Sequence, residues 1–332
     1  MSAAVRANPW LNTAAWRNLF RDRPLIPLSG LLVVLVVTIQ IEDPGIVNLP
    51  WCGVILRASV PLAILGGCQT LTMLTGGIDL SVATVASMAG FVTATFVHSP
   101  GGWVQGMVIA LAAAALAGLV TGIGVGVFRV HPLIMTLAMS FVVLGFANVW
   151  QLQTVQTGAG VPSELRWIGS NNLSDIIPYS LLVFVPLTLL ILIGLRRTGF
   201  GRLLFAIGDN PVAARLSGVR SPQVLIVLYV ISAVLAAIAG LVISGLTNTA
   251  SVSLADPYLL PSVAAAVIGG TSIMGGRGGF AGTIVGALIL TVLTALLTVL
   301  GLPEPTRLHR RQLVLAESSP AHEAWRRHGR FI

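Results

Sequence analysis

The residues able to do chemistry are few and scattered along this chain. Its two cysteines, Cys52 and Cys68, form no metal-ligand pattern, and we interpret them as small core residues rather than a disulfide. His98 and His131 stand alone near the ends of apolar runs, and no Ser/His/Asp set, HExxH motif or carboxylate pair stands out. We therefore expect no catalytic residue and no metal site.

Asp79 is the clearest acid within the apolar part of the chain. It lies in the stretch TGGIDLS, where Gly76 and Gly77 interrupt a helix. A charged Asp inside a membrane bundle is costly unless it finds partners, so it marks either a hinge or a polar point on a substrate path. The alternative is that Asp79 or Ser81 simply caps the next helix. We favour a cap combined with a hinge over direct substrate contact.

A second glycine-rich stretch, VIGGTSIMGGRGGFAGTIVGA, spans residues 267–287. Six of its glycines stand in pairs: Gly269 with Gly270, Gly275 with Gly276, and Gly278 with Gly279. This pattern favours close backbone approach or a bent connection. A phosphate-binding loop would need a GK[ST] ending, which Arg277 does not replace, so we exclude nucleotide binding by this chain. Both glycine stretches precede a small-residue helix, which is compatible with an internal duplication.

The most polar internal segment is residues 196–220, which holds one acid, Asp209. Its basic residues are Arg196, Arg197, Arg202, Arg215 and Arg220. Asn210 fits an N-cap, Pro211 the first helical position and Gly218 the left-handed position after a helix. The sequence thus predicts a helix over 211–217, roughly 10 Å long. It suits docking to a cytoplasmic partner; the alternative is an ordinary basic loop that fixes topology.

Composition defines the elements that must position these residues. The 332-residue chain is 55% hydrophobic and only 9% charged, with a mean hydropathy of +0.91, which excludes the soluble classes. Long apolar runs, rather than short alternating strands, favour helices over a barrel. The net charge of +8 does not indicate nucleic acid binding, because the arginines cluster in loops and termini. We predict an all-α, polytopic transmembrane helix bundle.

About nine apolar runs are candidate membrane spans. They are 25–41, 54–74, 80–97, 103–128, 133–150, 179–195, 223–246, 258–274 and 280–302. With a cytoplasmic N-terminal segment 1–24, this count puts Arg129, the 196–220 loop and Arg277 on the cytoplasmic side, as the positive-inside rule requires. The tail 303–332 breaks the agreement, because nine spans place it outside although it carries six arginines.

Three of these stretches resemble one known family. GDNPVAARLSGV resembles the cytoplasmic coupling loop of the sugar-type ABC permeases, the ribose/xylose/autoinducer-2 group; TGGIDLS and the IGG run resemble two further motifs of that family. The resemblance covers residues 25–302. It implies coupling to an ATPase through Gly208, Asp209, Asn210, Pro211, Ala213, Ala214, Arg215 and Gly218. It places a hinge or translocation path at Gly76, Gly77, Asp79, Ser81, Gly269, Gly270, Gly275 and Gly276.

The resemblance also implies the partners of the chain. It predicts a permease subunit of a binding-protein-dependent importer for a monosaccharide or related polyol, in the bacterial inner membrane. A second permease subunit, a periplasmic substrate-binding protein and an ABC ATP-binding subunit complete the system. ATP and Mg²⁺ bind in the ATPase, so this chain is not an enzyme and is expected to bind no cofactor.

Two alternatives follow from the same residues. An ion-coupled secondary transporter would use Asp79 as a proton or cation site, although the bundle offers few other intramembrane acids. A non-functional, truncated or frameshifted permease would explain the tail 303–332, because family members usually continue into a tenth apolar span and this chain does not. A divergent cytoplasmic tail is the other explanation of that end.

Overall fold

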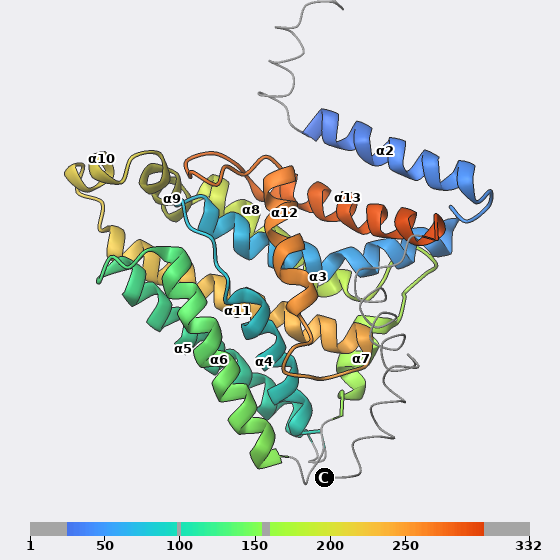
Figure 1. Ribbon diagram of the computed structural model, residues 1–332, viewed down its shortest axis with the longest axis horizontal. Coiled ribbons are helices and arrows are strands. Elements are labelled where there is room, and N and C mark those ends of the chain that lie inside the picture. The colour runs from blue at the N-terminus through green and yellow to red at the C-terminus, as the bar shows by residue number, and fades with distance from the viewer. Residues whose placement is uncertain (1–24, 98–100, 155–159, 302–332) are drawn as a thin grey trace, which may run out of the picture.

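The computed structural model describes residues 25–97, 101–154 and 160–301. Regular structure in these ranges is helical, apart from an isolated bridge between Asn172 and Pro178, so the predicted all-α bundle is confirmed (Figure 1). The N-terminal segment 1–24 and the tail 303–332 lie outside the described residues. What the sequence indicates about them stays a prediction.

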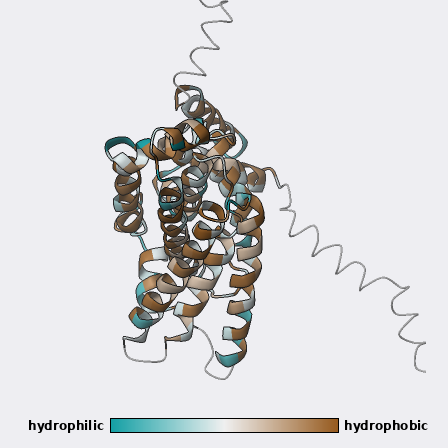
Figure 2. Ribbon diagram, turned by 90° about the vertical axis from the view of Figure 1, so that its left-hand side faces the viewer, coloured by the Kyte–Doolittle hydropathy of each residue, from teal (hydrophilic) through white to brown (hydrophobic). Residues whose placement is uncertain are grey.

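Six helices in the described part of the chain are long and apolar enough to cross a membrane. They are α2 (Leu25–Glu42), α3 (Leu49–Met73), α5 (Gly102–Gly126), α6 (Pro132–Thr154), α11 (Ser221–Thr247) and α13 (Phe280–Val299). A seventh candidate is the pair α8 (Leu181–Arg197) and α9 (Gly199–Asp209), which is bent by 68°. Hydrophobic residues run along these helices, and hydrophilic ones gather toward helix ends and loops (Figure 2).

Two predicted spans form helices that are too short to cross a bilayer alone. α4 (Val82–Thr95) has 14 residues and α12 (Leu259–Ile268) has 10. At 1.5 Å per residue they reach roughly 21 Å and 15 Å, against about 30 Å of hydrocarbon. Predicted span 80–97 loses two residues at each end, whereas 258–274 is shortened because a turn that begins at Gly269 replaces its last part. The remaining short elements are α7 (Ser163–Ser170), α10 (Pro211–Leu216) and the 3₁₀ turn η2 (Asp256–Tyr258).

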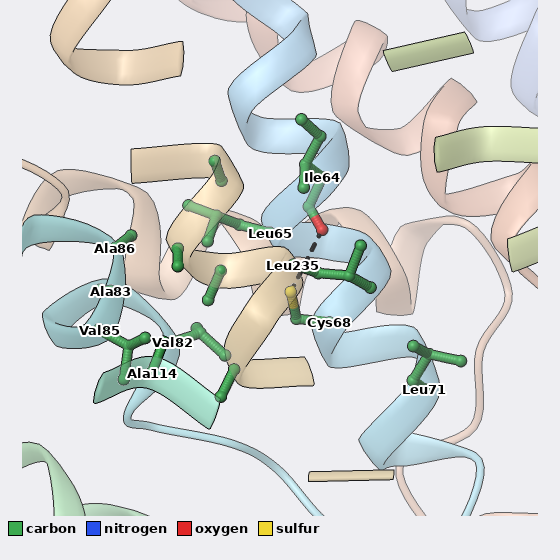
Figure 3. Packing of buried hydrophobic residues seen from close by; sticks show 14 of the residues in the cluster. Ile64, Leu65, Cys68, Leu71, Val82, Ala83, Val85, Ala86, Ala114 and Leu235 are labelled. Atoms are coloured by element: carbon green, nitrogen blue, oxygen red, sulfur yellow. Dashed lines mark hydrogen bonds between the residues drawn. The ribbon is translucent and has the colours of Figure 1, made fainter. Parts of the chain in front are cut away.

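α11 lies at the centre of the bundle and packs against α3, α4, α5 and α7, while α13 packs against α2, α3 and α12. The glycines of α5 permit its close approach to α11, as small residues do in membrane bundles: a Cβ at Gly122 would lie 2.6 Å from the Cα of Ile226. Cys68 lies in this core, where its thiol donates to the carbonyl of Ile64 at 3.4 Å (Figure 3). Both cysteines are free, and the prediction of a core residue holds for Cys68, whereas Cys52 is only half-buried.

The helix connections gather at two opposite ends of the bundle. One end holds the α3–α4, α9–α10 and α12–α13 connections, and we call it the arginine-rich end because Arg196–Arg220 and Arg277 lie there. The other end holds α7 and the outer end of α3, where the Arg57 guanidinium donates to the carbonyl of Ser170 and, at 3.3 Å, to Oδ1 of Asn172. This arrangement agrees with the alternation predicted from the arginines.

Candidate functional site: a capped helix and the loops beneath it

The short helix α10 begins at Pro211, as its sequence predicts, and ends at Leu216, one residue before the predicted end. The Asn210 Oδ1 accepts hydrogen bonds from the amides of Val212 and Ala213, both at 3.0 Å, and Pro211 is the first helical residue. Gly218 follows the helix with φ +84° and donates its amide to the carbonyl of Arg215 at 3.0 Å. These bonds satisfy the end groups of a two-turn helix, so α10 is held by its own caps.

One face of α10 packs on the bundle and the other is open. Ala214 is buried in the main core cluster, whereas Val212 and Leu216 expose 56% and 85% of their side chains. These two residues are one helical turn apart and therefore lie on one face. An open apolar pair beside Arg215, at the arginine-rich end, is suited to docking rather than to fixing topology alone.

α9 precedes α10, and sequence reasoning missed it as a helix. The segment 199–209 looked like part of a polar loop, because its glycines and Arg202 masked an amphipathic pattern. Gly201, Leu204 and Ile207 are buried. α9 thus ties the protruding α10 to the bundle.

The end of α9 touches two other connections, backbone to backbone. A Cβ at Gly208 would overlap the carbonyl oxygen of Leu74 and lie 2.6 Å from the amide nitrogen of Gly276. Gly276, at φ +71°, donates that amide to the Leu74 carbonyl at 3.0 Å. A Cβ at Gly275 would lie 3.0 Å from the Gly76 amide nitrogen. We call Gly76, Gly208, Gly275 and Gly276 the glycine junction.

The glycine junction joins two sets of residues that the sequence predicted separately. Gly208 belongs to the predicted coupling set, and the other three glycines belong to the predicted hinge set. The remaining predicted glycines lie nearby in other roles: a Cβ at Gly77 would lie 3.0 Å from Pro132, and one at Gly269 would be 2.6 Å from the Gly282 carbonyl oxygen. The segment that carries α10 is therefore in backbone contact with the α3–α4 break.

Asp79 lies in that break and is buried among neutral donors. Its Oδ1 accepts from the Ser81 amide at 3.0 Å and the Ser81 hydroxyl at 2.6 Å, and its Oδ2 accepts from the Ser232 hydroxyl of α11 at 3.0 Å. Of the two residues expected to cap α4, Asp79 accepts the amide of the N-cap residue, but the expectation is wrong for Ser81. Ser81 occupies the N-cap position but makes no capping bond, because its hydroxyl turns back to Asp79.

Two further side chains, which sequence reasoning missed, hold the broken backbone. The Gln69 amide group of α3 donates to the Asp79 carbonyl at 2.8 Å and accepts from the Asp79 amide at 3.2 Å. The Thr136 hydroxyl of α6 donates to the Ile78 carbonyl at 3.2 Å and accepts from the Leu80 amide at 3.1 Å. The sequence signal that could have identified Gln69 and Thr136 is that both are polar residues within apolar spans. Within the described residues, no group of three or more His, Cys, Asp or Glu could hold a metal.

The architecture defines a class: a multi-pass helical membrane protein with broken helices and a capped helix projecting at its arginine-rich end. The chain belongs to the family described as branched-chain amino acid transport system / permease component, which matches residues 53–314. It is 33% identical to the ribose import permease protein RbsC of Escherichia coli K12, over 87% of this chain and 88% of that protein.

Two other relatives are named for sugars. The fructose import permease protein FrcC of Rhizobium meliloti is 32% identical over 74% of this chain and 70% of its own length. The galactofuranose transporter permease protein YtfT of E. coli K12 is 33% identical over 75% and 72%. No solved structure matches the chain. The resemblance to the ribose-type sugar permeases is confirmed.

Proposed function

We propose that this chain is the membrane-spanning subunit of a binding-protein-dependent ABC importer that moves a monosaccharide or related polyol across the bacterial inner membrane. An ABC ATP-binding subunit docks on α10 from the cytoplasm, and ATP and Mg²⁺ bind in that subunit rather than in this chain. A periplasmic substrate-binding protein delivers the sugar, and a second permease subunit completes the path. The sugar names of the relatives support the substrate class.

The observation that carries the proposal is the build of α10. It is capped at both ends, anchored through Ala214, and open along Val212 and Leu216. This apolar pair is exposed in the part of the chain that the structure describes, and it would give an ATPase an apolar contact on a helix fixed to the bundle. Because Gly208, next to the last residue of α9, touches the backbone of Leu74 and Gly276, a displacement of α10 would reach the α3–α4 and α12–α13 connections through direct backbone contacts.

Reconstitution tests this function. The chain is placed in proteoliposomes with its binding protein and ATP-binding subunit, and uptake of labelled ribose and other monosaccharides is followed. We expect uptake that requires ATP and both partners. The double variant Val212→Glu/Leu216→Glu is expected to lose ATPase binding and uptake. Leu173→Glu, which changes an exposed apolar residue at the opposite end, is a control that keeps ATPase binding.

The same vesicles separate the alternatives. Uptake driven by a proton or sodium gradient without ATP would contradict the ABC importer and favour a secondary transporter that uses Asp79. Asp79→Asn would then abolish gradient-driven uptake. A folded chain that binds no ATPase and transports nothing would favour the non-functional reading.

A further inference from the structure

The two most exposed large hydrophobic side chains of the described residues lie on separate connections at the same end of the bundle. Leu216 ends α10, and Met274, 87% exposed, lies in the α12–α13 connection with its partly open neighbour Ile273. Lipid-facing helices account for many exposed apolar residues in a membrane protein, but neither of these two lies within a membrane-spanning helix. Met274 therefore needs another explanation.

The loop around Met274 is closed by its own hydrogen bonds. The Ser272 amide donates to the Arg277 carbonyl at 2.9 Å, and the Gly275 amide donates to the Ser272 carbonyl at 3.2 Å. The Ser272 hydroxyl accepts from the Met274 amide at 3.2 Å. A loop fixed in this way presents Met274 outward in a defined position instead of letting it fold back onto the bundle.

The loop is continuous with the base of α10. Directly after Met274, Gly275 and Gly276 pack on Gly208 and Asp209, and in Figure 1 the α12–α13 connection runs beside α9. The glycine junction thus joins the α10 segment and the Met274 loop into one surface. A partner protein that binds over Val212 and Leu216 would therefore also be close to this surface.

We infer that Ile273 and Met274 form a second contact for the ATP-binding subunit, beside α10. This inference rests on the proposed function, which supplies the partner. Methionine suits such a contact because its flexible, polarizable side chain adapts to an apolar pocket. Two contacts on either side of the glycine junction would make the ATPase move the α3–α4 and α12–α13 connections together, instead of pulling on α10 alone.

Affinity measurements on the full-length chain in nanodiscs test the second contact. The dissociation constant for the ATP-binding subunit is measured for the wild type, Met274→Glu, Met274→Leu, Leu216→Glu and the control Leu173→Glu. We expect Met274→Glu to raise the dissociation constant about fivefold or more, the scale of a contact residue, and Met274→Leu and Leu173→Glu to stay within about twofold. Thermal unfolding checks that each variant is folded.

The outcomes separate the two proposals. Weakening by Leu216→Glu with no change from Met274→Glu would overturn the second contact and leave the proposed function standing. Wild type that binds no ATP-binding subunit would overturn both. A fluorescent bimane on Met274→Cys, in a Cys52→Ser background, adds a direct readout: its spectrum should shift when the ATP-binding subunit is added. Quenching by lipid-borne quenchers with no such shift would assign Met274 to the membrane surface instead.

Discussion

The two glycine-rich connections of this bundle, 74–81 and 269–279, are built in different ways. Both separate a short helix from a longer one, and both lie at the arginine-rich end. The first is mostly buried and is held by side chains from α3, α6 and α11, with Asp79 at its centre. The second is open, exposes Met274 and Arg277, and is closed by its own backbone and the hydroxyl of Ser272.

This difference shows that glycines set how closely backbones approach, while the surrounding side chains decide what is buried. The 74–81 connection leaves backbone groups of residues 78–80 without helical partners, and Gln69 and Thr136 supply those partners. Buried backbone groups require such bonds. The 269–279 connection has no need of them, because it reaches solvent. Where the two meet, the Gly276 amide bonds to the Leu74 carbonyl.

The largest loss of stability is expected from Gln69→Leu, which removes two of the hydrogen bonds that hold the 74–81 connection. The change leaves the Asp79 amide and carbonyl unsatisfied, and each such group costs about 1–3 kcal/mol. We therefore expect a loss of about 2–6 kcal/mol, seen as a much lower thermal unfolding midpoint of the purified chain.

Ser232→Ala is the graded control for Gln69→Leu. It removes one hydroxyl from the Asp79 carboxylate, which keeps both donors from Ser81, so a smaller loss of about 1–2 kcal/mol is expected. A Gln69→Leu variant as stable as the wild type would show that the hydrogen bonds of the Gln69 side chain do not hold this connection. The contrast between the two connections would then be wrong.

An intermediate effect is expected from Gly208→Ala, which attacks the contact between the two connections. The new methyl group overlaps the Leu74 carbonyl, and overpacking of this kind costs about 1–3 kcal/mol. Gly145→Ala in α6 is the matched control, because nothing lies within 4 Å of its Cβ position. In proteoliposomes we expect Gly208→Ala to slow ATP-driven uptake more than it weakens ATPase binding. Equal loss from both variants would contradict a specific junction.

Local chemistry made part of this structure predictable. The ends of α10 follow from Asn210, Pro211 and Gly218, since each acts on backbone within a few residues, and the long spans follow from apolar runs. The shortening of α4 and α12 and the partners of Asp79 did not follow. Ser232 lies 153 residues from Asp79, so one sequence gives no reason to pair them. The contact between the predicted coupling and hinge residues at Gly208 could not be predicted either, because these residues are far apart in the sequence.

The smallest effect is expected from Arg277→Ala, which tests whether the open connection really depends on its backbone. The Arg277 carbonyl accepts the Ser272 amide and remains in the variant, while its side chain is exposed and makes no hydrogen bond among the described residues. Surface changes of this kind stay within about 0.5 kcal/mol, so the unfolding midpoint should barely move. Should Arg277→Ala destabilise the chain as strongly as Gln69→Leu, side chains would hold both connections and the distinction between them would be lost. An unchanged midpoint would instead leave the Arg277 side chain free for a partner, because that side chain would not be needed to hold the fold.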